Sequence, residues 1–291
     1  MIHRLIFVSV LAVCFIPQTR GVEPHLPTPS RDYQNFCASC HGKNGDGQGK
    51  AARFLFPKPR SLTSHPFQYA TSMNRVASSQ DIELVIREGI PNTSMNGWTA
   101  LTDLQIQSLV RDVLAFRLYG ANKRYLDLLV NNGELLNTAD SVFSPQQIAE
   151  QEKYVKKETI PASNWKFEIA AQTPNSLANG QRLYMTQNCH KCHGQDGRGS
   201  YGIDLIGEYG FPTFARDLVS EPFKYGTAAT DVARGIKLGI NGTKMPASTT
   251  LNDEELGDLT LYVLSLHKPQ KTTLTNAQRY QRSIGNLDKT R

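Results

Sequence analysis

The feature that most constrains this chain is a five-residue pattern that occurs twice. Residues 37–41 read Cys-Ala-Ser-Cys-His, and residues 189–193 read Cys-His-Lys-Cys-His. The two copies stand 152 residues apart, and the glycines that follow them recur at the same offset. A repeat of this length indicates two versions of one structural module.

A Cys-x-x-Cys-His run is the attachment sequence of c-type haem. Its two thiols join the haem vinyl groups as thioethers, and the histidine binds the iron from below. One such run could also be a redox Cys-x-x-Cys pair or half of a zinc site, but the repetition favours haem. We therefore predict two covalently bound haem c groups, attached by four cysteines and ligated by two histidines: Cys37, Cys40, Cys189, Cys192, His41 and His193.

The segments after each run repeat in the same order. A glycine-rich loop comes first, and glycine lets the backbone pass close to a flat ring. A phosphate-binding loop is excluded, because neither a preceding strand nor a following Lys-Ser/Thr is present. Each half then ends in an amphipathic helix with a capping box, which begins after Thr102 in the first half and after Asn252 in the second.

The N-terminus is typical of an exported protein. Arg4 precedes an apolar run of 12 residues from Leu5 to Ile16, and small residues precede Val22. Twelve residues are fewer than the roughly 20 that span a bilayer, so residues 1–21 are predicted to be a signal peptide cleaved near Gly21. An uncleaved anchor is the alternative. We expect a periplasmic protein without a transmembrane segment in its mature chain.

Cysteine and charge counts exclude several classes of function. Cys14 leaves with the signal peptide and the other four of the five cysteines belong to the pentads, so none remains for a disulfide or a nucleophile. Loss of Arg4 and Arg20 reduces the formal charge from +6 to +4, which argues against nucleic-acid binding.

The domain organisation follows from the repeat. Residues 22–30 should form an extended arm, 31–120 the first domain, 176–270 the second and 271–291 a basic tail. Residues 121–175 form a linker with helices expected over 125–130 and 146–155. The linker is too long for a simple tether and too apolar in places to be wholly disordered, so it is predicted to pack across both domains.

Each half resembles a class I cytochrome c domain, over roughly residues 31–120 and 176–268. The resemblance implies an all-α fold of two tandem domains and a distal methionine ligand on a loop before the last helix. Met95 lies 54 residues after His41, and Met245 lies 52 residues after His193, so these two methionines match the family's ligand position. A thioether ligand favours ferrous iron and raises the reduction potential.

Two arginines at matched positions are candidate partners of the haem propionates. Arg60 and Arg216 begin similar segments in the two halves. A guanidinium pairs with a carboxylate through two hydrogen bonds, and a buried propionate needs such a partner.

Two haems that each carry histidine and methionine have no open position for a substrate. The sequence therefore predicts a dihaem cytochrome, not an enzyme, that relays single electrons between redox proteins, with a membrane-bound respiratory complex as one candidate partner. A dihaem peroxidase is the enzymatic alternative, and the electron-transfer subunit of a larger oxidoreductase is a third interpretation.

Overall fold

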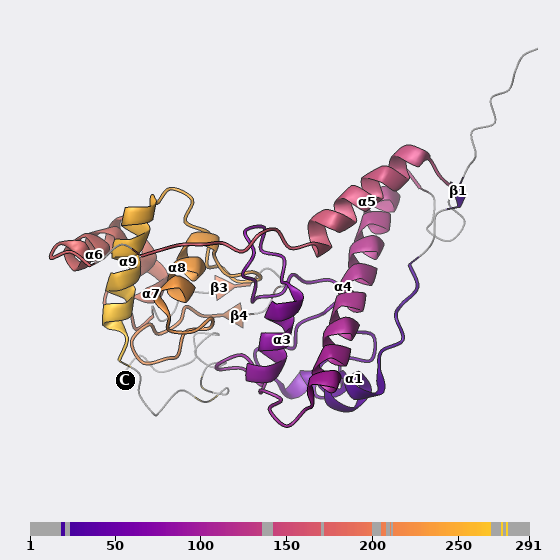
Figure 1. The fold of residues 1–291 in the computed structure, drawn as a ribbon, viewed down its shortest axis with the longest axis horizontal. Helices are drawn as coiled ribbons and strands as arrows, with labels where there is room; N and C mark the ends of the chain where they lie inside the picture. The colour runs from indigo at the N-terminus through magenta and orange to yellow at the C-terminus, as the bar shows by residue number, and fades with distance from the viewer. Residues whose placement is uncertain are drawn as a thin grey trace, which may run out of the picture.

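The described part of the chain is almost entirely helical. The structure is a computed structural model that describes residues 19–20, 24–135, 142–169, 172–199, 205–207, 210, 212–268, 275 and 278. Its helices form two groups that lie side by side, α1 to α4 and α6 to α9, while α5 packs beside the far end of α4 (Figure 1). The expected all-α fold with two tandem domains is confirmed.

The first domain is built from four α-helices and a short 3-10 helix. They are α1 (Arg31–Phe36), α2 (Ala38–His41), η1 (Ala52–Phe54), α3 (Ser79–Glu88) and α4 (Asp103–Asn131). Hydroxyl side chains begin three of them: Ser30 caps α1, and Ser78 and Thr102 form capping boxes at α3 and α4. The apolar faces of α3 and α4 enclose a core around Ile82, Ile106 and Leu109.

The second domain repeats this plan with α6 (Ser176–Thr186), α7 (Cys189–His193), α8 (Ala229–Leu238) and α9 (Asp253–Leu266). Asn252 supplies the expected capping box of α9. The core surrounds Leu183, Leu256 and Leu259, each no more than 2% exposed. Helix α6 packs closely against α9, as α1 packs against α4 in the first domain.

Helix α4 is longer than the sequence predicted. The helix expected after Thr102 and the helix expected over 125–130 form one helix of 29 residues. Glycine disfavours helix interiors, but Gly120 is retained here because α4 touches the main chain of Thr63 at this point. The second half of α4 forms a small core of its own with Phe143 and α5 (Pro145–Thr159).

The linker packs across both domains, as predicted. Beyond α5, the amide of Asn74 donates to Ile160 O at 3.0 Å, and Met73 N donates to Ser163 O at 3.0 Å. Trp165 N donates to Thr71 O at 3.1 Å, so this segment is hydrogen-bonded to the first domain. The stacked rings of Trp165 and Phe167 then pack on the core of the second domain.

The two domains also touch directly. The side-chain amide of Asn241 donates to Phe67 O at 2.8 Å and to Arg75 O at 3.0 Å, and the Tyr225 hydroxyl donates to Gln68 O. The rings of Tyr69 and Tyr225 meet edge to face with their centroids 5.0 Å apart. Tyr69 and Tyr225 occupy matched positions in the repeat, so equivalent segments of the two modules meet at this interface.

Short strands complete the description. β1 (Thr19–Arg20) pairs with β2 (Val142–Phe143), and β3 (Leu205–Ile206) pairs with β4 (Pro212–Thr213), both antiparallel. Apart from β1, the predicted signal peptide lies outside the described residues, as does the predicted tail except for 275 and 278. Within the described ranges, no helix combines the length and the apolar character needed to cross a membrane.

The contact between α4 and Thr63 gives a test of the packing. A Cβ at Gly120 would collide with the Thr63 carbonyl, whereas one at Gly257 in α9 would meet Ile169 at an ordinary 3.9 Å. We expect Gly120→Ala to lower the free energy of unfolding by about 1–3 kcal/mol. Gly257→Ala should raise it by up to about 1 kcal/mol. Urea unfolding followed by circular dichroism measures both, and equal effects of the two variants would contradict the contact.

Candidate haem sites

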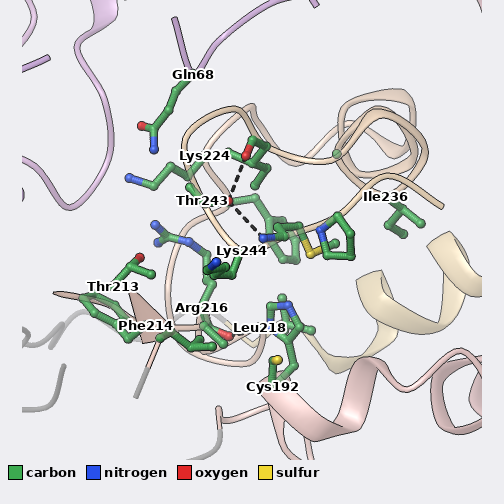
Figure 2. Close-up of a pocket in the computed structure, with 18 of the residues that line it drawn as sticks. Gln68, Cys192, Thr213, Phe214, Arg216, Leu218, Lys224, Ile236, Thr243 and Lys244 are labelled. Atoms are coloured by element: carbon green, nitrogen blue, oxygen red, sulfur yellow. Dashed lines mark hydrogen bonds between the residues drawn. The ribbon is translucent and has the colours of Figure 1, made fainter. Parts of the chain in front are cut away.

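Each Cys-x-x-Cys-His run occupies one helical turn at the edge of a domain. Cys37 caps α2, and Cys189 opens α7. Residues three apart lie on the same face of a helix, so the two sulfurs of each run face the same way. Figure 2 shows Cys192 at the floor of the second pocket. In the described part of the chain these cysteines form no disulfide, and burial, followed by the charge of Asp112, raises the pKa of the Cys37 thiol to about 12.

The histidine of each run is held by a main-chain carbonyl. His41 Nδ1 lies 2.9 Å from Arg60 O, and His193 Nδ1 lies 3.0 Å from Arg216 O. A carbonyl oxygen can only accept, so Nδ1 carries the hydrogen and Nε2 keeps its lone pair for a metal. Such a bond fixes the tautomer and orientation of a metal-binding histidine.

The surroundings of both histidines favour the neutral form that a metal requires. Burial lowers the pKa of His41 and of His193, and the neighbouring guanidinium charges of Arg60 and Arg216 lower it further. The hydrogen bond to the carbonyl opposes this shift only in part. A neutral imidazole can bind iron without first losing a proton.

The glycine-rich loops bring the carbonyls to the histidines. Gly47 N donates to His41 O at 2.8 Å, and Gly199 N donates to His193 O at 2.7 Å. The same loops then bind the next segment, because Leu62 N donates to Gly45 O at 2.6 Å and the second domain repeats this bond. Gly45 has φ +68°, and a Cβ there would press on the Phe116 ring at 2.8 Å. Glycine is therefore required by both conformation and space.

Two loops of identical design carry the methionines. Thr93 Oγ1 donates to Ile90 O at 2.8 Å and accepts from Met95 N at 3.1 Å. Thr243 makes the same two bonds, to Ile240 O at 2.9 Å and from Met245 N at 3.1 Å, which are drawn in Figure 2. In each loop the threonine hydroxyl therefore holds the main chain of the methionine in place.

A cavity of a size that suits a large planar ligand lies beside each Cys-x-x-Cys-His run, and the second cavity is lined by residues of both domains. The first measures about 400 Å³ and the second about 560 Å³. Small-molecule pockets range from about 300 to 1,000 Å³ and are mainly apolar. Each cavity is lined by its two cysteines, its histidine and its loop methionine: Cys37, Cys40, His41 and Met95 in the first, and Cys189, Cys192, His193 and Met245 in the second.

This arrangement fits covalently bound haem. Two thiols on one edge, a neutral nitrogen and a thioether around one apolar cavity are the donors that such a group needs. The apolar walls would cover the ring. When bound, haem would supply an iron that exchanges one electron between its ferric and ferrous states.

The two arginines differ in their surroundings. Arg216 lines the second cavity, where its Nη1 donates to Pro222 O at 2.8 Å and lies 3.5 Å from Glu221 Oε2. Arg60 lines the first cavity and also the second. Both therefore lie at the haem cavities, and their pairing with propionates stays a prediction.

Comparisons with known protein families agree with this geometry. A family model described as cytochrome c matches residues 177–267. A model described as cytochrome c oxidase, cbb3-type, subunit III matches residues 25–111. The chain is a dihaem c-type cytochrome. Its two domains imply two covalently bound haem c groups with iron.

Relatives of this cytochrome include subunits of a respiratory oxidase. It is 30% identical over 151 residues to the cbb3-type cytochrome c oxidase subunit CcoP of Rubrivivax gelatinosus, covering 49% of this chain and 44% of that protein. It is 27% identical over 135 residues to the CcoP of Azospirillum brasilense, covering 42% and 43%. The cytochrome spans less than half the length of these relatives.

A solved structure shares the fold over most of the cytochrome. A chain of the reducing HAO-like protein complex of Kuenenia stuttgartiensis superposes with a TM-score of 0.62 and 27% sequence identity. The alignment covers 84% of this cytochrome and 100% of that chain.

One pair of supporting residues was missed by the sequence reasoning. The Tyr33 hydroxyl donates to Gly42 O at 2.8 Å, and the Tyr184 hydroxyl donates to Gly194 O at 2.7 Å. Both bonds hold the glycine that ends the haem-binding turn. The repeat did contain a signal, since each tyrosine lies four or five residues before the first cysteine of its run.

Removing these hydroxyls tests their role. Tyr33 and Tyr184 are at most 1% exposed, and phenylalanine would remove one of the two donors to each carbonyl, which also accepts from Gly45 N or Gly197 N at 3.2 or 3.3 Å. We expect Tyr33→Phe and Tyr184→Phe each to lower the free energy of unfolding by about 0.5–1.5 kcal/mol. Tyr125→Phe serves as the control, because its hydroxyl makes a longer bond of 3.3 Å outside the haem domains. A control as destabilised as the two variants in urea unfolding would contradict the assignment.

Proposed function

We propose that this cytochrome relays single electrons in the periplasm through two haems, each ligated by one histidine and one methionine. The observation that carries the proposal is the matched pair of cavities, each with a held histidine and a loop methionine in its lining. A haem with both axial positions filled by protein has no site for a substrate. Electron transfer is the chemistry that remains.

The protein's own residues prepare the sites for this role. The carbonyls of Arg60 and Arg216 fix the histidines, and the threonine-braced loops hold the methionines. A site that is held in place changes little when its iron gains or loses an electron, so little reorganisation opposes the transfer. The neutral sulfur of methionine favours the ferrous state and a higher potential than a second histidine would.

We further propose that the cytochrome works as the electron-transfer subunit of a larger oxidoreductase complex. The relatives that it resembles are named as an oxidase subunit and as part of a redox complex. The Kuenenia chain supports this choice most, because the alignment covers all of it. The proposal concerns the partners and leaves the chemistry of the two haems unchanged.

The peroxidase alternative makes a different demand on the sites. A haem that reduces peroxide needs a vacant or easily displaced distal position. Here both cavities carry a methionine on a hydrogen-bonded loop. A ferric protein with a high-spin component that readily binds cyanide or peroxide would overturn the relay and favour the peroxidase.

Substitution of the loop methionines tests the ligand assignment. We expect the wild-type ferric protein to show two low-spin haems and the weak far-red sulfur-to-iron band. Met95→Ala or Met245→Ala should each remove about half of that band, open one haem to cyanide and lower its potential. Met73→Ala and Met185→Ala are matched controls, since these methionines are 57% and 37% exposed. An intact band in either ligand variant would refute the assignment.

Isolation from native membranes tests the role as a subunit. We expect the tagged cytochrome to co-purify with a second redox protein and, when reduced beforehand, to pass electrons to it. Stopped-flow absorbance at the haem bands follows the oxidation. An unrelated exported protein with the same tag controls for non-specific capture. A cytochrome that elutes alone and is not oxidised by the membrane fraction would contradict the proposal.

A further inference from the structure

The two haem cavities share one wall. Among the described residues, four consecutive positions of the first domain and one further residue line both cavities: Pro57, Lys58, Pro59, Arg60 and Gln68. The other residues that line the first cavity also belong to the first domain. A single stretch of main chain therefore stands between the two sites.

This wall is fixed on both of its sides. On the first side, Arg60 O holds His41, and the Gly47 backbone leaves no room for a Cβ beside Pro59 O. On the second side, Gln68 O accepts a hydrogen bond from Tyr225, which lines the second cavity. Figure 2 shows Gln68 reaching from the first domain toward the second pocket, on the side where Lys224 and Arg216 lie.

Arg60 is the charged residue of this wall that acts toward both sites. Lys58 is turned back to η1, where its Nζ donates to Ala52 O at 3.1 Å and Arg53 O at 3.2 Å. Arg60 Nη1 is buried. Arg60 is in the lining of the first cavity and of the second.

The matched arginine of the second domain borders one cavity, not both. Arg216 lines the second cavity and is absent from the lining of the first. Its guanidinium lies 3.5 Å from the carboxylate of Glu221, whose side chain is 3% exposed. Arg216 is therefore paired with a carboxylate beside its own cavity, and the two arginines of the repeat differ in the cavities that they line.

We propose that Arg60 serves both haems as a shared cation and makes both of their reduction potentials depend on one side chain. A nearby positive charge favours the iron state that carries the lower positive charge, which is the ferrous state after gain of one electron. The same charge compensates the negative carboxylates of the haem groups. The proposal rests on the presence of two haems and not on the identity of any electron donor or acceptor.

The test is a redox titration of the holoprotein, followed by absorbance, with Arg60→Gln and its matched control Arg216→Gln. We expect Arg60→Gln to lower the equilibrium constant for reduction of both haems, each by roughly tenfold, or about 59 mV for a one-electron couple. Arg216→Gln should shift one component and leave the other unchanged. Arg60→Lys, which keeps the charge, should restore most of both shifts.

Two outcomes would overturn the proposal. One is an Arg60→Gln protein that binds two haems but shows a changed reduction potential for only one of them or for neither. The other is an Arg216→Gln protein in which both reduction potentials shift equally. If the Arg60→Gln protein does not take up haem, substitution of Gln68, which also lines both cavities, provides the test. Gln68 is partly exposed, so Gln68→Glu should lower both potentials and Gln68→Lys should raise both, and a shift of a single component would be contrary to a shared wall.

Discussion

The structure depends on the hydrogen bond between the histidine of each Cys-x-x-Cys-His run and a main-chain carbonyl 19 or 23 residues later. This bond orients the ring and leaves Nε2 as the nitrogen that would bind an iron. It also brings the segment that begins at Arg60 or Arg216 against the cavity. The glycine loop must fold back tightly for the bond to form, so the glycines, the histidine and the cavity wall form one unit.

The two modules share a plan but differ in their positions within the protein. The wall of the first module borders both cavities, whereas the wall of the second borders its own. Around it, Tyr69 and Tyr225 pack together, and the Arg234 guanidinium lies 5.6 and 5.5 Å from their ring centroids. The duplicated modules have similar sites, but the packing of the two domains places a segment of the first module in the lining of both cavities.

Sequence reasoning reached the parts that depend on local pattern. The haem-binding runs, the glycine loops, the capped last helices and the methionine positions were all visible because the repeat shows each of them twice. The structure places Met95 and Met245 in the lining of the two cavities. Arg60 and Arg216 also lie at the cavities, although the repeat implied that they were equivalent.

The rest could not be predicted, because it depends on contacts between distant segments. The helix after Thr102 and the one over 125–130 were expected as separate helices, but in the fold they are one, and Gly120 within it is the point where α4 passes Thr63. The hydroxyls of Tyr33 and Tyr184 find carbonyls that only the folded turn presents. The shared wall requires the relative placement of two domains, on which a repeat carries no information.

The aromatic pair Trp165 and Phe167 has a consequence for the independence of the second domain. The linker that carries this pair is hydrogen-bonded to the first domain, and its two stacked rings pack on the core of the second. The second domain therefore depends on the linker to complete its core, and a fragment that began at the repeat boundary near residue 176 would lack part of its own interior.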